Sequence, residues 1–129
     1  LNLLNELQEA RNLTYLFITH DLSVVKYVSD DICVMYLGQI IEHCETEKLF
    51  ETPMHPYTKA LLEAVPVPRL TGKGRREIIR GEVTSPINPP AGCRFAARCP
   101  FAEEACSEPQ PLSEVQPGHY VACHKAAVI

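Results

Sequence analysis

Thr14-Tyr15-Leu16-Phe17-Ile18-Thr19-His20-Asp21 is a nearly continuous run of apolar and β-branched residues that ends in two polar ones. The part of the chain over residues 13–19 is typical of a strand that is covered on both faces in a parallel sheet. Asp21 is suited to cap the N-terminus of a short helix whose leucine and valines face inward. A strand, a polar turn and a helix in this order predict an α/β fold.

Two further elements are predicted on either side of this run. Residues 2–11 carry leucines at helical spacing with polar residues between them, so we expect an amphipathic helix that ends near Asn12. Residues 32–36 and 39–43 flank Leu37-Gly38, a pattern that predicts two strands joined by a tight glycine turn.

Later signals are more local. Thr46 is predicted to cap a short helix over residues 47–51, and Pro56 suits the first turn of another helix. Regular structure then becomes sparse, although residues 78–83 are compatible with a strand. Cys33, in an apolar strand, is interpreted as a small buried hydrophobic residue.

The composition changes near residues 66–68 and divides the chain into two expected units, 1–65 and 66–129. The first unit is rich in Leu, Val and Ile, whereas most of the 11 prolines fall in the second. The formal net charge is 12 − 16 = −4, and no basic stripe with interleaved aromatic residues is present, so nucleic acid is not an expected partner. We also expect a chain that is neither exported nor membrane-spanning, since it has no apolar run of about 20 residues and no signal peptide.

Four of the six cysteines lie in the proline-rich unit, at Cys93, Cys99, Cys106 and Cys123. The absence of a secretion signal in this sequence favours free thiols or metal ligands over a disulfide framework. Four thiolates form a complete shell for Zn²⁺ or for a [4Fe-4S] cluster. Zinc sites usually pair their ligands as Cys-x2-4-Cys, and spacings of five and six residues favour the larger cluster over zinc. A metal-free chain with disulfides formed by oxidation is the remaining alternative.

Histidines are the other candidates for chemistry. His20 follows the predicted parallel strand, where α/β folds place their ligand sites, and its imidazole suits an anionic group such as a terminal phosphate. The alternative is that His20 only closes a turn. His119 and His124 flank Cys123 and are possible ligands in a zinc site, although we interpret both as surface histidines.

The segment Ile18-Thr19-His20-Asp21-Leu22, followed by Val34-Met35-Tyr36-Leu37-Gly38-Gln39-Ile40, resembles the end of an ABC transporter ATPase domain. Pro53-Met54-His55-Pro56-Tyr57-Thr58 and Gly92-Cys93-Arg94-Phe95-Ala96-Ala97-Arg98-Cys99-Pro100 resemble the C-terminal extension of ATP-binding subunits in oligopeptide, dipeptide and nickel importers. The resemblance covers essentially the whole chain. It implies the end of an ATPase domain over 1–65 and a small, irregular, Pro/Cys-rich extension over 66–129.

Several expectations follow from this resemblance. It implies that His20 is the switch histidine that contacts the ATP γ-phosphate, and that the four cysteines of the extension hold an iron-sulfur cluster. It also implies a second ATP-binding subunit and transmembrane permease subunits as partners, with the protein on the cytoplasmic face of the bacterial inner membrane. The choice between peptides and nickel is left open, since it belongs to other subunits.

The chain departs from the ATPase pattern in one respect. It contains no Gly-x-x-x-x-Gly-Lys-Ser/Thr loop and no Leu-Ser-Gly-Gly-Gln signature, so nothing in it cradles the phosphates or holds Mg²⁺. We therefore expect a truncated protein that does not hydrolyse ATP alone and whose severed sheet makes it self-associate. The competing hypotheses are a regulatory or dimerising module and, less favoured, an independent iron-sulfur redox protein.

Overall fold

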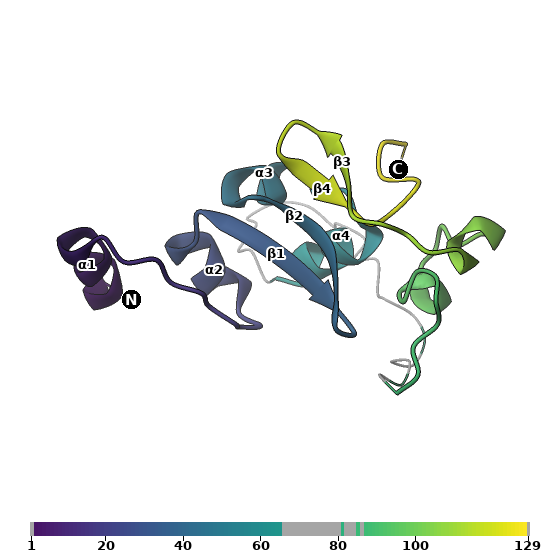
Figure 1. Ribbon diagram of the computed structural model, residues 1–129, viewed down its shortest axis with the longest axis horizontal. Coiled ribbons are helices and arrows are strands. Elements are labelled where there is room, and N and C mark those ends of the chain that lie inside the picture. Colours follow the sequence, from purple (N-terminus) through teal and green to yellow (C-terminus); the bar gives the residue numbers. More distant parts are fainter. Residues whose placement is uncertain (1, 66–80, 82–84, 86, 129) are drawn as a thin grey trace, which may run out of the picture.

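A β-hairpin forms the centre of the fold (Figure 1). In the computed structural model, which describes residues 2–65, 81, 85 and 87–128, β1 (Asp31–Tyr36) and β2 (Gln39–Glu45) pair in antiparallel fashion. Leu37 and Gly38 between them both have positive φ, 46° and 78°. Two such residues make the type I′ turn that matches the twist of paired strands. The predicted hairpin is confirmed, and its second strand is two residues longer than expected.

Two strands from the C-terminal part of the chain extend this sheet. β3 (Ser113–Gln116) and β4 (His119–Val121) are joined through Gly118, which has a φ of 70°. The sheet order is β1-β2-β4-β3, and every neighbouring pair is antiparallel. The extension is thus more regular than expected here, and one sheet contains strands from both expected units.

The core lies on the inner face of the hairpin. β1 alternates exposed and buried residues, so that Ile32, Val34 and Tyr36 point inward. Tyr36 packs against Tyr57 and Phe95, with ring centroids 4.7 and 5.3 Å apart. Aromatic pairs at such separations add stability beyond the burial of their area. The extension therefore contributes a side chain to the same core as the hairpin.

Short helices surround the sheet (Figure 1). α2 (Leu22–Val28) is capped as predicted, because the Asp21 carboxylate accepts hydrogen bonds from the backbone N–H groups of Ser23 and Val24. α3 (Thr46–Glu51) follows β2, and α4 (Pro56–Glu63) begins at the predicted proline. Within the described residues, no helix is long and apolar enough to cross a bilayer.

The predicted parallel strand over residues 13–19 is wrong. These residues form no strand, and the residues Leu16 and Ile18 are 91% and 95% exposed. α1 (Asn2–Arg11), also expected, has no buried residue in its described part and stands apart from the sheet (Figure 1). A strand needs neighbours for its backbone hydrogen bonds, and the described sheet offers none to this segment. The sheet of this α/β chain is therefore antiparallel where a parallel one was expected.

Two smaller predictions also fail. Thr46 does not cap α3 with its side chain, because its hydroxyl donates to the backbone oxygen of Ser29 at 2.6 Å. Cys33 is exposed, since the alternation along β1 places it on the outer face. The strand suggested at residues 78–83 lies, apart from Gly81, outside the described residues.

Candidate functional site

The four cysteines of the extension come together around one cavity. Cys93, Cys99, Cys106 and Cys123 all line it, and all four are free thiols of intermediate exposure. The cavity has a volume of about 10 Å³, which is room for about one water molecule. Their clustering in the sequence predicted that these four cysteines form one ligand set. The structure brings them together around one cavity.

Backbone contacts hold two of these cysteines close to each other. The N–H of Cys93 donates to the backbone oxygen of Cys106 at 2.8 Å. Gly92 makes this approach possible, because a Cβ at this position would lie 2.3 Å from the Cys106 oxygen. Contacts of that length do not occur without a shift of the backbone, so a side chain at residue 92 would separate the two segments.

Tight turns position the cysteines individually. The short 3-10 helix η1 (Ala96–Arg98) lies between Cys93 and Cys99, and η2 (Glu104–Ser107) contains Cys106. 3-10 helices rarely exceed about three or four residues, so the chain changes direction after each of them. These changes of direction bring successive cysteines to the same cavity. Pro100 lies between these two turns, and Pro109, Pro111 and Pro117 follow between Cys106 and Cys123. Prolines at these positions oppose longer helices.

Burial raises the pKa values of the thiols of Cys93, Cys99 and Cys123, and for each of them proximity to other cysteines of the set adds to the rise. Without a metal these thiols are therefore protonated at neutral pH, and a bound cation would displace the protons. No group of three or more His, Cys, Asp or Glu side chains among the described residues is arranged to hold a single metal ion. The four cysteines line one cavity, but their side chains do not form a binding site for a single metal ion.

His124 also lines this cavity, but its ring is already committed. Its Nδ1 contacts the Gln110 side-chain oxygen at 3.0 Å, and its Nε2 contacts a Glu103 carboxylate oxygen at 2.8 Å. Glu103 also pairs with Lys125. Both nitrogens of His124 face oxygen acceptors, so neither is available as a metal ligand in this arrangement.

His55 is a residue of this site that sequence reasoning missed. It lines the cavity at the start of α4, and only 1% of it is exposed. Burial lowers its pKa to about 4, against a smaller opposing effect of Glu42. The ring is therefore neutral at pH 7. The available signal was its position before Pro56, where a helix needs an N-cap acceptor.

A buried carboxylate connects this site to the sheet. Glu42 is fully buried in β2. One of its oxygens accepts from the N–H of Met54 at 2.8 Å and from His119 Nε2 at 2.7 Å, and the other accepts from the N–H of His55 at 2.9 Å. The prediction that His119 is a surface histidine is thus wrong, because it is fully buried against this carboxylate. An acidic residue directly after two isoleucines in a strand was the signal for such a site.

His20 lies in a bend before α2, exposed to solvent. The N–H of Asp21 donates to the Thr19 hydroxyl at 3.1 Å, and the Asp21 side chain caps α2. These contacts hold the backbone on both sides of His20 in a defined turn. His20 does not line the cysteine cavity. The structure therefore keeps the two predicted sites separate.

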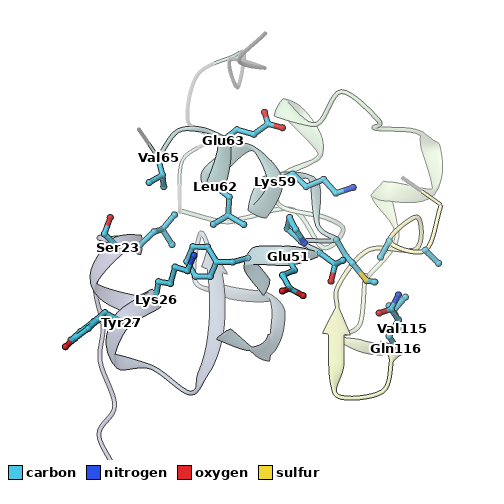
Figure 2. A pocket seen from close by; sticks show the side chains of 17 residues that line it. Ser23, Lys26, Tyr27, Glu51, Lys59, Leu62, Glu63, Val65, Val115 and Gln116 are labelled. Carbon is cyan, nitrogen blue, oxygen red and sulfur yellow. The ribbon is translucent and has the colours of Figure 1, made fainter. Parts of the chain in front are cut away.

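A second, larger groove of about 1280 Å³ lies between α2, α3, α4 and β3 (Figure 2). Its lining is mixed, with Lys26 placed over the Phe50 ring at 5.0 Å and Leu62 and Val115 on its walls. None of the site residues predicted from the sequence lines it. The groove therefore shares no residue with the two sites predicted from the sequence.

Comparison with known proteins places these features in a wider group. A family model described as the C-terminal region of oligopeptide/dipeptide transporters matches residues 41–106. The chain is 53% identical, over 96% of its length, to the oligopeptide transport ATP-binding protein AppF of Bacillus subtilis. It is 52% identical, over 95% of its length, to the dipeptide transport ATP-binding protein DppF of Haemophilus influenzae. The chain spans only 39% and 38% of these two relatives.

Proposed function

Because this chain belongs to the family of oligopeptide/dipeptide transporter C-terminal regions, we propose that it serves in a subunit that hydrolyses ATP to drive peptide import. The observation that carries this proposal is the identity of about half of all residues to AppF and DppF across nearly the whole chain. The family model matches residues 41–106, a range that includes His55, Pro56 and three of the four cavity cysteines, Cys93, Cys99 and Cys106. The proposed location is the cytoplasmic face of the bacterial membrane, with permease subunits and a second ATP-binding subunit as partners.

In this proposal His20 contacts the ATP γ-phosphate. Its exposed position at a fixed turn supports the role, because the ring is free to meet a phosphate held by another part of the subunit. The phosphate-binding loop and Mg²⁺ site would come from segments that this sequence does not contain. We therefore propose that the isolated chain does not hydrolyse ATP, and its exposed apolar residues near Ile18 support self-association of the isolated chain.

A chimera tests this function. The matching C-terminal region of Bacillus subtilis AppF is replaced by this chain, and the chimera is compared with AppF that lacks the region. We expect the chimera to restore ATP hydrolysis and oligopeptide uptake in cells without their own AppF, and the shortened protein to restore neither. A chimera that is folded and binds its partner subunits, yet supports no uptake, would contradict the proposal.

We further propose that the four cysteines hold a [4Fe-4S] cluster. The donor set fits, because four thiols surround one cavity and each iron of a cluster needs only one protein sulfur. Neither metal has a preformed site, because no group of three or more His, Cys, Asp or Glu side chains among the described residues is placed to hold an ion. The preference for the cluster over zinc rests on the spacing of the cysteines in the sequence. As the cavity is small, the thiols must turn outward to admit a cluster. Bound there, it would join the turns of the extension and supply one-electron chemistry.

Metal analysis of anaerobically purified chain tests the cluster. We expect about four irons and four sulfides per chain, and loss of both in Cys106→Ser. The matched control is Cys33→Ser, because Cys33 is exposed on the outer face of β1 and does not line the cavity. Stoichiometric zinc, or disulfides without metal, would contradict the cluster while leaving the transport function untouched.

A second candidate function is a regulatory or dimerising module built around this cavity. It is supported by the sheet, which joins the extension directly to the hairpin through β2 and β4. The two functions differ in the chimera experiment. A module of this kind predicts that Cys106→Ser changes subunit pairing or its control, while the ATP hydrolysis of each assembled complex stays the same.

A further inference from the structure

The turn that carries His20 is closed by a hydrogen bond across it. The Thr19 hydroxyl accepts this bond from the backbone N–H of Asp21 at 3.1 Å. Threonine hydroxyls form local turns of this kind with the backbone two residues later. Since His20 is the residue between the two partners, the Thr19 side chain restrains the backbone of His20 directly.

Asp21, the donor of this bond, is itself held at the start of α2. Its carboxylate accepts from the backbone N–H groups of Ser23 and Val24, at 2.9 and 3.3 Å. Its backbone oxygen accepts from the N–H of Val25 at 3.1 Å. Asp21 therefore belongs to the first turn of the helix, and the Thr19 hydroxyl ties the chain before the turn to that helix.

This hydrogen bond matters because packing does not fix the turn. Thr19, His20 and Asp21 are all exposed, so burial does not hold their backbone in place. A reacting group that is misplaced by about 1 Å can lose about a hundredfold in rate. An imidazole that acts on a phosphate therefore depends on whatever holds its backbone, and in this turn that is the bond from Asp21 to Thr19.

We propose that Thr19 is a positioning residue for ATP hydrolysis, whose hydroxyl holds His20 in the direction in which its imidazole meets the γ-phosphate. This inference rests on the proposed function, from which it takes the contact between His20 and ATP. In the reaction water attacks the γ-phosphorus and the bond to the bridging oxygen breaks, giving ADP, inorganic phosphate and a proton. His20 stabilises the charge on the phosphate oxygens, and Thr19 acts only through His20.

Two variants of Thr19 in the AppF chimera separate the hydroxyl from the rest of the side chain. Thr19→Val removes the hydroxyl at nearly the same shape, whereas Thr19→Ser keeps it. The matched control is Thr52→Val, because the Thr52 hydroxyl also makes one local bond, to the backbone oxygen of Lys48 at 3.1 Å, outside this turn. The His20→Ala chimera is measured beside them. The measurements are kcat for ATP hydrolysis and the affinity for ATP.

We expect Thr19→Val to lower kcat by about tenfold, which is the order expected when the backbone of one residue regains its freedom. The affinity for ATP should change by less than about twofold, because the phosphate-binding loop supplies most ground-state contacts. Thr19→Ser and Thr52→Val are expected to stay within about twofold of the unchanged chimera in both measurements.

Three outcomes overturn the inference. A Thr19→Val chimera that is as fast as the unchanged one, while His20→Ala loses hydrolysis, overturns this inference alone and leaves the role of His20 in place. Equal losses in the Val and Ser variants, or a parallel loss of ATP affinity and hydrolysis, assign Thr19 a role in packing only. A His20→Ala chimera that stays active overturns the proposed contact with ATP, and this inference with it.

Discussion

Glu42→Ala is expected to lower the free energy of unfolding by about 3 to 5 kcal/mol, because three buried donors lose their common acceptor. The N–H groups of Met54 and His55 and the ring of His119 all point at this carboxylate. These donors have no access to bulk water in the folded chain, since Glu42 and His119 are fully buried. Small domains are stable by only about 5 to 15 kcal/mol, so the loss is a large share of the total.

Urea unfolding of the chain followed by circular dichroism measures this effect. Glu45→Ala is the matched control, because Glu45 stands at the end of the same strand with its side chain exposed. It is expected to change stability by less than about 0.5 kcal/mol. Glu42→Gln tests the charge, since the amide presents a donor where only acceptors fit, and it should be nearly as harmful as alanine. Equal midpoints for Glu42→Ala and Glu45→Ala would contradict the role given to this carboxylate.

The sequence patterns that predicted elements correctly were local ones. Leu37-Gly38 between two β-rich segments is enough to specify a hairpin, and Asp21 and Pro56 act within one turn of the helices they start. None of these depends on residues far away in the chain. Their physical causes are short-range, so they can be recognised without a structure.

The elements that were missed depend on distant partners. Residues 13–19 have the composition of a buried strand, but composition does not supply the neighbouring strands that would bond to them. β3 and β4 are short and flank a Pro117-Gly118 turn, and they become strands because β2 offers its free edge to β4. A Pro-Gly pair between Val115 and Tyr120 was a usable turn signal.

The candidate site divides in the same way. The clustering of four cysteines in the sequence indicated a common site, and they do line one cavity. The sequence did not indicate that Glu42 and His55 belong to this site, because the hydrogen bond between them joins residues 13 positions apart. His119 joins them from 77 residues away. Buried polar networks of this kind are set by the tertiary fold, so single residues give little sign of them.

His20→Ala is expected to lower ATP hydrolysis by the AppF chimera by about 100- to 1000-fold, the usual cost of removing one hydrogen-bond donor from a developing charge. The affinity for ATP should change by less than about tenfold, because the phosphate-binding loop supplies most ground-state contacts. The fold should not change, since the His20 side chain is exposed and Asp21 still caps α2.

His43→Ala is a suitable control for this histidine. His43 is partly exposed on β2, where it stacks on Tyr120 and lies 3.8 Å from Asp31, away from the turn before α2. Steady-state hydrolysis and ATP binding are measured for both variants in the same chimera. A His20→Ala chimera that hydrolyses ATP as fast as the His43→Ala chimera would mean that His20 only closes a turn. If hydrolysis alone is lost while ATP still binds, the imidazole acts on the phosphate in the transition state, because a contact made equally in the ground state would lower the affinity for ATP as well.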